Sequence, residues 1–153
     1  TVAHCKSLIE DAIAKGAELL VGGETTQNVL MPAHLVDKIT PDMKLFRDES
    51  FGPVVGIARA RDEAHAIAMA NDTEYGLSAS VFTKDIAKGL KVAKQIQSGI
   101  CHVNGSTVHD EAQMPFGGMK SSGYGRFGGK AGIDAFTEMR WITVETEPGH
   151  FPI

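Results

Sequence analysis

Two adjacent carboxylates, Asp48 and Glu49, come just before an aromatic residue and a Gly-Pro pair in the segment 48–53, which reads DESFGP. These residue types are compatible with sugar recognition, because a carboxylate at the carboxyl edge of a sheet can accept hydrogen bonds from sugar hydroxyls. The alternative is a polar loop whose Phe51 packs into the core. The spacing alone leaves both interpretations open.

Thiols and imidazoles are the next groups that could do chemistry. The chain has two cysteines and six histidines without HxxxH or CxxC spacing, so we predict no metal site. Cys5 lies on an apolar helix face, where cysteine usually behaves as a small hydrophobic residue. Cys101 and His102 are neighbours on a predicted strand, so their side chains point to opposite faces and do not form a nucleophile–base pair. A thiol hydrolase that uses Cys101 stays open as an alternative.

The segment Met114–Gly129, MPFGGMKSSGYGRFGG, holds six of the 17 glycines. Such density costs backbone entropy in a helix or strand, so it predicts a tightly wound loop against a ligand or a neighbouring element. Gly123, Gly125 and Gly128 spell GxGxxG, but a dinucleotide motif follows a strand and opens a long helix, and no strand precedes this one. A Walker loop is excluded too, because Lys120 lacks the required glycine spacing. We therefore assign no phosphate to this loop.

Length and composition limit the classes of protein to consider. At 153 residues the chain fits one ordinary domain, and 42% apolar with 22% charged residues is a typical globular mixture. The formal net charge of −4 argues against a nucleic-acid partner, and there is no apolar run of about 18 residues to span a membrane. Two cysteines are too few for a disulfide scaffold, which favours a reducing, cytoplasmic setting. Because Thr1 leads straight into a helical pattern, without an initiator Met, we expect a piece of a longer chain.

The order of the predicted elements indicates how these residues are positioned. Strands and helices alternate in the middle of the chain at lengths typical of parallel crossovers, so we predict an α/β fold with a parallel sheet and crossover helices. Asp62 is the predicted N-cap of one helix. The other predicted helices span 2–15, 85–97 and 130–136, with a helix start at 40–42, and the predicted strands span 18–21, 54–58, 77–82, 100–103 and 140–146, with 29–39 strand-like but broken by Pro32.

Several ordered motifs carry a resemblance to a known family. DESFGPVVGIARA, then ANDTEYGLSASVFTKD, then VNGSTVHDEAQMPFGGMKSSGYGR resemble the C-terminal third of the NAD(P)-dependent aldehyde dehydrogenase superfamily. The match runs from the first helix and the GAELLVGG turn to the terminal RWITVET strand, which is essentially the whole chain. In detail the chain is most similar to the branch that oxidises benzaldehyde, salicylaldehyde and vanillin.

The resemblance implies roles for particular residues. Glu49 falls on the glutamate that binds the nicotinamide-side ribose of NAD or NADP, and Phe51 on the residue that packs beside the nicotinamide. The loop 105–114 corresponds to the lining of the aldehyde tunnel, with Val108 and His109 nearest the pocket and Phe116 at its end. Residues 1–138 are then the C-terminal portion of the catalytic domain. Residues 139–153 form an oligomerisation strand and tail, which implies a homodimer or homotetramer.

Departures from the family pattern limit what can be transferred. Asp48 replaces a glutamate that is not the ribose ligand, and we transfer no adenine-side ribose role to Thr1 or His4. In the family, the nucleophilic cysteine, the general-base glutamate, the oxyanion asparagine and the dinucleotide-binding half all precede the segment matched here. We therefore assign no catalytic residue to this chain, expect it to be inactive alone, and do not distinguish NAD from NADP. The alternative is a self-standing, non-enzymatic α/β module that assembles through its terminal strand.

Overall fold

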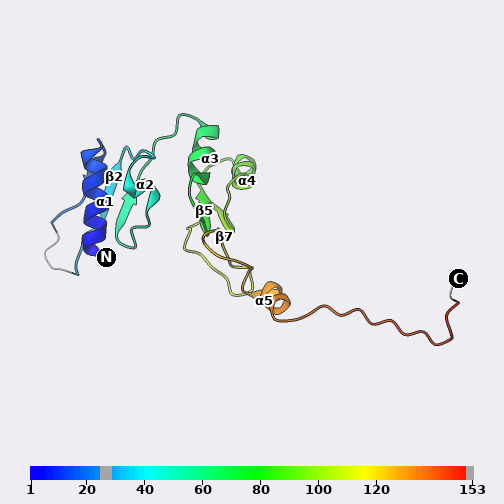
Figure 1. Cartoon of the computed structure of the whole chain (residues 1–153). Helices are drawn as coiled ribbons and strands as arrows, with labels where there is room; N and C mark the ends of the chain where they lie inside the picture. The colour runs from blue at the N-terminus through cyan, green and yellow to red at the C-terminus, as the bar shows by residue number, and fades with distance from the viewer. Residues whose placement is uncertain (25–28, 151–153) are drawn as a thin grey trace. The chain divides into compact units, whose positions relative to one another are not determined.

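The structure is a computed structural model that describes residues 1–24 and 29–150 (Figure 1). The chain divides into two compact units, residues 1–73 and residues 74–153, and each is described by itself. The predicted division between a catalytic-domain portion, 1–138, and an oligomerisation strand and tail, 139–153, is a different one and stays a prediction. Residues 151–153, at the end of the predicted tail, lie outside the described residues.

The first unit packs one long helix along a small mixed sheet (Figure 1). Helix α1 (Val2–Ala14) buries one face, because its apolar residues recur every three or four positions. Strand β2 (His34–Asp37) pairs with β1 (Glu18–Val21) in antiparallel and with β3 (Val54–Gly56) in parallel orientation. The remaining elements of the unit are the helices α2 (Lys44–Arg47) and α3 (Glu63–Asn71). The core formed between helix and sheet contains Cys5, Ile9, Ala12, Ala17, Val36, Ile39, Met43 and Val54.

Polar contacts fix α1 to the start of α2. Asp11 Oδ2 accepts hydrogen bonds from the Lys44 backbone N–H at 2.8 Å and from Lys15 Nζ at 3.1 Å. Lys15 Nζ also donates to the carbonyl of Asp42 at 2.6 Å. The Lys44 N–H, followed by the Lys15 ammonium, lowers the pKa of Asp11, because both stabilise its ionised form.

The second unit contains the predicted strand–helix–strand crossover. Strand β5 (Ser78–Val81) runs parallel to β6 (Ile100–Val103), with helix α4 (Ile86–Ala93) between them in the chain. Strand β4 (Tyr75–Gly76) pairs in antiparallel orientation with β7 (Met119–Lys120), and the short helix α5 (Gly129–Ala135) follows. Asp85 caps α4 by accepting the Lys88 N–H at 3.0 Å.

Most predicted elements are confirmed, with differences at their ends. Asp62 caps α3 as predicted and accepts the His65 N–H at 2.8 Å. The strand-like stretch 29–39 shortens to β2, and the helix predicted for 85–97 ends at Ala93. The prediction that β3 and the strand after α3 form a parallel pair is wrong, because β3 pairs with β2 and the later strand β5 pairs with β6. Residues 140–146 form no strand with any described part of the chain, since they have no neighbouring strand to pair with.

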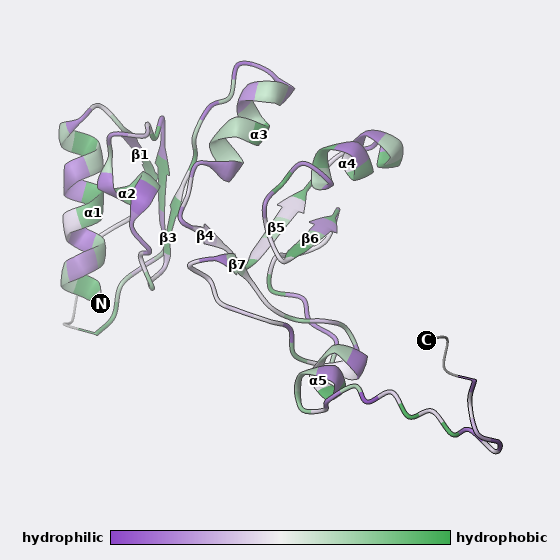
Figure 2. Cartoon of the chain, turned by 45° about the vertical axis from the view of Figure 1, so that its right-hand side comes forward, coloured by the Kyte–Doolittle hydropathy of each residue, from purple (hydrophilic) through white to green (hydrophobic). Residues whose placement is uncertain are grey.

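Apolar residues are distributed unequally between the units. Among the described residues, every fully buried apolar side chain lies in the first unit. In the second unit, apolar side chains such as Phe82, Tyr124, Phe127 and Phe136 are exposed. Figure 2 shows apolar residues alternating with polar ones along the segment after α5. No helix in the described part of the chain is long and apolar enough to cross a membrane.

Candidate functional site

The first candidate site, in the first unit, is the loop of residues 48–53, here called the DESFGP loop. It begins at the C-cap of α2, where the Asp48 N–H donates to the carbonyl of Lys44 at 2.8 Å, and it leads into β3. Glu49 is exposed, and the Phe51 side chain is 80% exposed. The alternative of a polar loop required Phe51 to pack into the core. Its exposure shows that this part of the alternative is wrong for the first unit.

Phe51 adopts a backbone conformation that few side chains tolerate. Its φ is 46°, in the left-handed region, which costs of the order of 1–3 kcal/mol for a residue other than glycine. Strained residues of this kind cluster at ligand-binding sites, where the surrounding structure holds them. The DESFGP loop therefore presents an aromatic ring and a carboxylate to solvent.

A hollow of about 420 Å³ lies beside Phe51 in the first unit. Its wall is mostly apolar and is formed by Thr1, Val2, Val29, Met31, Phe51, Gly52 and Pro53. Glu49, two residues before Phe51 in the sequence, is exposed and is not among the residues that line the hollow. A carboxylate can accept hydrogen bonds from the hydroxyls of a ribose, and an aromatic ring can stack on a flat heterocycle. The residues present thus fit the nicotinamide half of a dinucleotide.

The second candidate site is a pocket of about 420 Å³ in the second unit, here called the β6 pocket. Two of the three predicted substrate residues, His109 and Phe116, line it. Val108 does not, since its side chain is 92% exposed. The lining consists of Gly99, Ile100, Cys101, His102, His109, Asp110, Glu111, Met114, Pro115 and Phe116.

The polar residues that line the β6 pocket are two histidines, His102 and His109, and two acids, Asp110 and Glu111. The rings of His102 and His109 meet edge to face, with centroids 5.9 Å apart and an interplanar angle of 77°. His109 Nε2 lies 3.5 Å from Glu111 Oε1, and His102 Nε2 is buried without a hydrogen-bond partner in the described structure. The pocket therefore combines apolar surface with imidazole groups that can meet a polar substituent. The sequence pointed to His102 only as the neighbour of Cys101 and did not predict its contact with His109, because nothing in its strand position reveals that contact.

Cys101 also lines the β6 pocket, but it lacks the properties of a nucleophile. Burial raises the pKa of the Cys101 thiol, whereas a reactive cysteine needs a lowered pKa. Cys5 is fully buried in the first unit. Among the described residues no group of three or more His, Cys, Asp or Glu side chains is arranged to hold a metal ion.

The loop that forms this pocket is fixed at its start by Asn104, which sequence analysis did not assign to the site. Asn104 Nδ2 donates to the carbonyl of Thr83 and its Oδ1 accepts the Thr83 N–H, both at 2.8 Å. Its φ of 59° is left-handed, a region that asparagine tolerates better than most residues. The signal was present in the dipeptide of Asn104 and Gly105, because Asn-Gly marks turns.

The glycine-rich run holds the other end of the loop. Phe116 and Phe127 exchange two backbone hydrogen bonds, of 2.8 and 2.7 Å, as an isolated bridge. Gly125, two residues before Phe127, and Gly128, between Phe127 and α5, have φ of 68° and 82° and let the chain turn back. Most of the segment 114–129 is loop, as predicted, but Met119–Lys120 form the short strand β7, which was not expected from the glycine density. The bridge between Phe116 and Phe127 supports Phe116 at the pocket.

Comparison with known proteins shows to which family the chain belongs. The model of the aldehyde dehydrogenase family matches residues 1–142, which is most of the chain. The chain belongs to the aldehyde dehydrogenase family. The resemblance stated from the sequence motifs is confirmed, and so is the α/β fold of a partial aldehyde dehydrogenase domain.

Two members of the family illustrate the similarity. A vanillin dehydrogenase from Pseudomonas fluorescens is 53% identical over 148 residues, which cover 97% of this chain and 30% of that protein. The crystal structure of a salicylaldehyde dehydrogenase from Pseudomonas putida G7, complexed with salicylaldehyde, matches with a TM-score of 0.90 and 46% identity, over 99% of this chain and 31% of that one. The chain therefore spans about 30% of the length of the curated relatives it matches.

Related structures of the family contain either nicotinamide cofactor. A glyceraldehyde-3-phosphate dehydrogenase from Bacillus halodurans, complexed with NADP, has a TM-score of 0.85 and 38% identity over 91% of this chain and 29% of its own. An aldehyde dehydrogenase from Mycobacterium tuberculosis, complexed with NAD+, has a TM-score of 0.81 and 34% identity over 89% of this chain and 29% of its own. Homologues of this chain thus bind NAD or NADP.

Proposed function

We propose that this chain is the C-terminal part of an enzyme that oxidises an aromatic aldehyde to the carboxylic acid with NAD(P)+. The observation that carries the proposal is the β6 pocket, in which Phe116 and the edge-to-face pair of His102 and His109 offer apolar surface beside polar groups. An aromatic ring with a hydroxyl substituent requires this combination of contacts. The similarity to enzymes named for salicylaldehyde and vanillin supports the same substrate class.

In this proposal, different residues of the chain bind the cofactor and the aldehyde. Glu49 accepts hydrogen bonds from the nicotinamide-side ribose, and Phe51 packs beside the nicotinamide. When bound, the cofactor supplies the hydride acceptor of the oxidation. Phe116 and His109 contact the aldehyde's ring and its substituent, while Val108 approaches it from the rim of the loop.

The chain contributes binding groups and no nucleophile. Cys5 is buried, and burial raises the pKa of the Cys101 thiol, so neither is an activated thiolate. We therefore propose that the attacking cysteine, the general base and the rest of the cofactor site come from the other part of the enzyme, and that this chain alone is inactive. The raised pKa of Cys101 also argues against the alternative of a thiol hydrolase.

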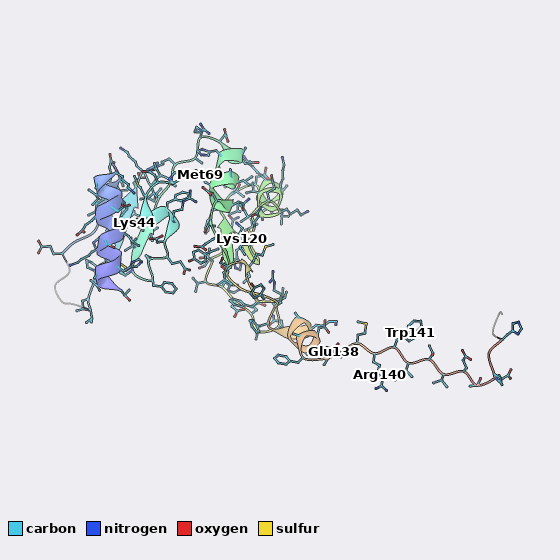
Figure 3. All side chains as sticks on the ribbon, in the orientation of Figure 1. Lys44, Met69, Lys120, Glu138, Arg140 and Trp141 are labelled. Carbon is cyan, nitrogen blue, oxygen red and sulfur yellow. The ribbon has the colours of Figure 1, made fainter. Side chains whose placement is uncertain are left out.

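Assembly is the second component of the proposal. Residues 140–146 are extended and expose Trp141, Ile142 and Val144, and Figure 3 shows the side chains of Arg140 and Trp141 on opposite sides of this segment. An unpaired segment with alternating side chains is a template for pairing with another strand. We propose that it joins the sheet of a neighbouring subunit in a homodimer or homotetramer. Deleting residues 140–146 is expected to shift the sedimentation coefficient to that of a smaller species.

The test uses a chimaeric enzyme in which residues 1–153 replace the matching segment of the Pseudomonas putida salicylaldehyde dehydrogenase. NAD(P)H formation is followed by absorbance with hydroxylated aromatic, unsubstituted aromatic and aliphatic aldehydes. His109→Ala is expected to reduce the ratio of kcat/KM for hydroxylated aromatic over aliphatic aldehydes about tenfold, which corresponds to about 1.4 kcal/mol. His65→Ala, outside the pocket, is the matched control.

Two results contradict the proposal in different ways. If the chimaeric enzyme oxidises no aldehyde with either cofactor, the assigned activity is wrong. If it is active and His109→Ala leaves the specificity ratio unchanged, the assignment of the β6 pocket to the substrate is wrong while the activity stands.

A further inference from the structure

The first turn of α1 holds the DESFGP loop through two consecutive side chains. Cys5 Sγ donates to the carbonyl of Ser50 at 3.2 Å, and His4 Nε2 donates to the carbonyl of Glu49 at 3.0 Å. Both acceptors belong to the backbone just before Phe51, and the donors lie 45 residues away in sequence. The two carbonyls are thus fixed by a helix that is itself packed on the core of the first unit.

The same sulfur also holds the residue on the other side of Phe51. A Cβ atom added to Gly52 would lie 2.4 Å from Cys5 Sγ, while the next nearest atoms, of Thr1 and Ser50, lie at ordinary contact distances of 3.6 and 3.7 Å. Cys5 therefore fills the space beside Gly52. Its side chain is fully buried, so the sulfur does not move aside into solvent.

Phe51 lies between these two anchored positions with a φ of 46°. A strained conformation persists only where the surrounding structure fixes it. Here the surroundings are the Ser50 carbonyl, bound by Cys5 Sγ, and Gly52, packed against the same atom. Release of either contact allows Phe51 to relax, which changes the direction of its ring and of the neighbouring Glu49.

We propose that Cys5 is a positioning residue for cofactor binding, assisted by His4, and that it acts by fixing the DESFGP loop from both sides of Phe51. The proposal rests on the proposed function of Glu49 and Phe51. It gives the buried thiol a role that requires no thiol chemistry. The thiol is a hydrogen-bond donor and a spacer of defined size.

The experiment is a double-mutant cycle in the chimaeric enzyme, with the Kd of NAD+ and NADP+ measured by calorimetric titration and the Tm measured without cofactor. The variants are Cys5→Ala, Cys5→Ser, Gly52→Ala and the double variant Cys5→Ala/Gly52→Ala. Ile9→Val is the matched control, because Ile9 lies one turn further along the same helix face and belongs to the same core. It removes buried volume without removing a contact to the loop.

Cys5→Ala is expected to raise the Kd about fivefold, and Cys5→Ser less, because the hydroxyl still donates. Gly52→Ala is expected to raise it about tenfold or more, because the new methyl group clashes with the sulfur. In the double variant the missing sulfur makes room for that methyl group, so the Kd falls below that of Gly52→Ala alone. Ile9→Val lowers the Tm and leaves the Kd unchanged.

Three results separate the possible failures. If Cys5→Ala lowers the Tm while the Kd stays within twofold of the unsubstituted enzyme, Cys5 has only a structural role and the proposal is overturned. If the double variant binds no better than Gly52→Ala, the steric part of the proposal is wrong. If the unsubstituted chimaeric enzyme binds neither cofactor, the proposed function itself fails.

Discussion

Replacement of Asn104 tests how the start of the pocket loop is held. Its side chain makes two hydrogen bonds to the backbone of Thr83, both 2.8 Å long. Its φ is 59°, which glycine adopts freely and alanine does not. Asn104→Gly therefore removes the hydrogen bonds alone, and Asn104→Ala removes them and adds backbone strain.

The structure sets the expected size of each effect. A net hydrogen bond contributes about 0.5–1.5 kcal/mol, and these two are exposed, so their joint loss costs about 1–2 kcal/mol of local stability. A left-handed conformation costs alanine about 1 kcal/mol more. We expect the free energy of local opening to fall by about 1–2 kcal/mol in Asn104→Gly and by about 2–3 kcal/mol in Asn104→Ala.

Hydrogen exchange followed by mass spectrometry measures this local opening in the chimaeric enzyme. A loss of about 2 kcal/mol accelerates exchange about 30-fold in peptides that cover β5 and β6, because each 1.4 kcal/mol is a factor of ten. Asn104→Asp keeps the acceptor for the Thr83 N–H but replaces the donor with a carboxylate oxygen that faces the Thr83 carbonyl, so it is expected to exchange faster than the unsubstituted enzyme. Peptides that cover β2, in the other unit, serve as the internal control.

The order of the variants decides the outcome. Exchange in Asn104→Ala that is no faster than in Asn104→Gly would refute the strain argument. Exchange at the unsubstituted rate in all three variants would show that the contacts between Asn104 and Thr83 do not hold the loop.

Two further predictions concern stability. The Arg59 guanidinium, with the Lys38 N–H, lowers the pKa of Asp37 from 3.8 to about 2, so the unfolded state takes up the proton first as the pH falls. The stabilisation from ionised Asp37 is complete above a pH of about 4 and is lost as the pH falls toward about 2. Asp37→Asn is therefore expected to make the Tm less dependent on pH in this range. A pH dependence of the Tm that is unchanged in this variant would contradict the role of the ion pair. Gly99→Ala places a Cβ 1.7 Å from the backbone oxygen of Gly117, in the glycine-rich run. It is expected to lower the free energy of unfolding, measured by thermal unfolding, by about 1–3 kcal/mol. The control Gly132→Ala, in α5 with no atom within 4 Å, is expected to stabilise by up to about 1 kcal/mol, and equal effects of the two alanines would contradict the steric argument.

Local signals in the sequence predicted much of the fold. The spacing of Cys5, Ile9 and Ala12 indicated α1, and Asp62 marked the start of α3, because periodicity and capping depend on residues within a few positions of each other. The parallel pair of β5 and β6 followed from the order of strand, helix and strand. The ordered motifs identified the family because several residues at fixed intervals rarely coincide by chance.

The side-chain arrangement of the site was not predictable in the same way. The sequence singled out His109 and Phe116, but the edge-to-face contact with His102 depends on how the loop after β6 folds back. Val108, predicted beside His109 on equal grounds, is exposed and does not line the pocket, because one residue along a loop changes which way a side chain points. The terminal segment 140–146 has the pattern of a strand, but a strand needs a neighbour, and its pattern alone supplies none.

The sequence by itself thus determined the elements, their order and the family, because these depend on local spacing and on motifs. Only the tertiary structure decided that Cys5 binds the Ser50 carbonyl across 45 residues, that Gly52 packs against the same sulfur, and that Phe51 between them takes a left-handed conformation. Such contacts depend on the path of the chain around the core, and no short-range pattern records that path.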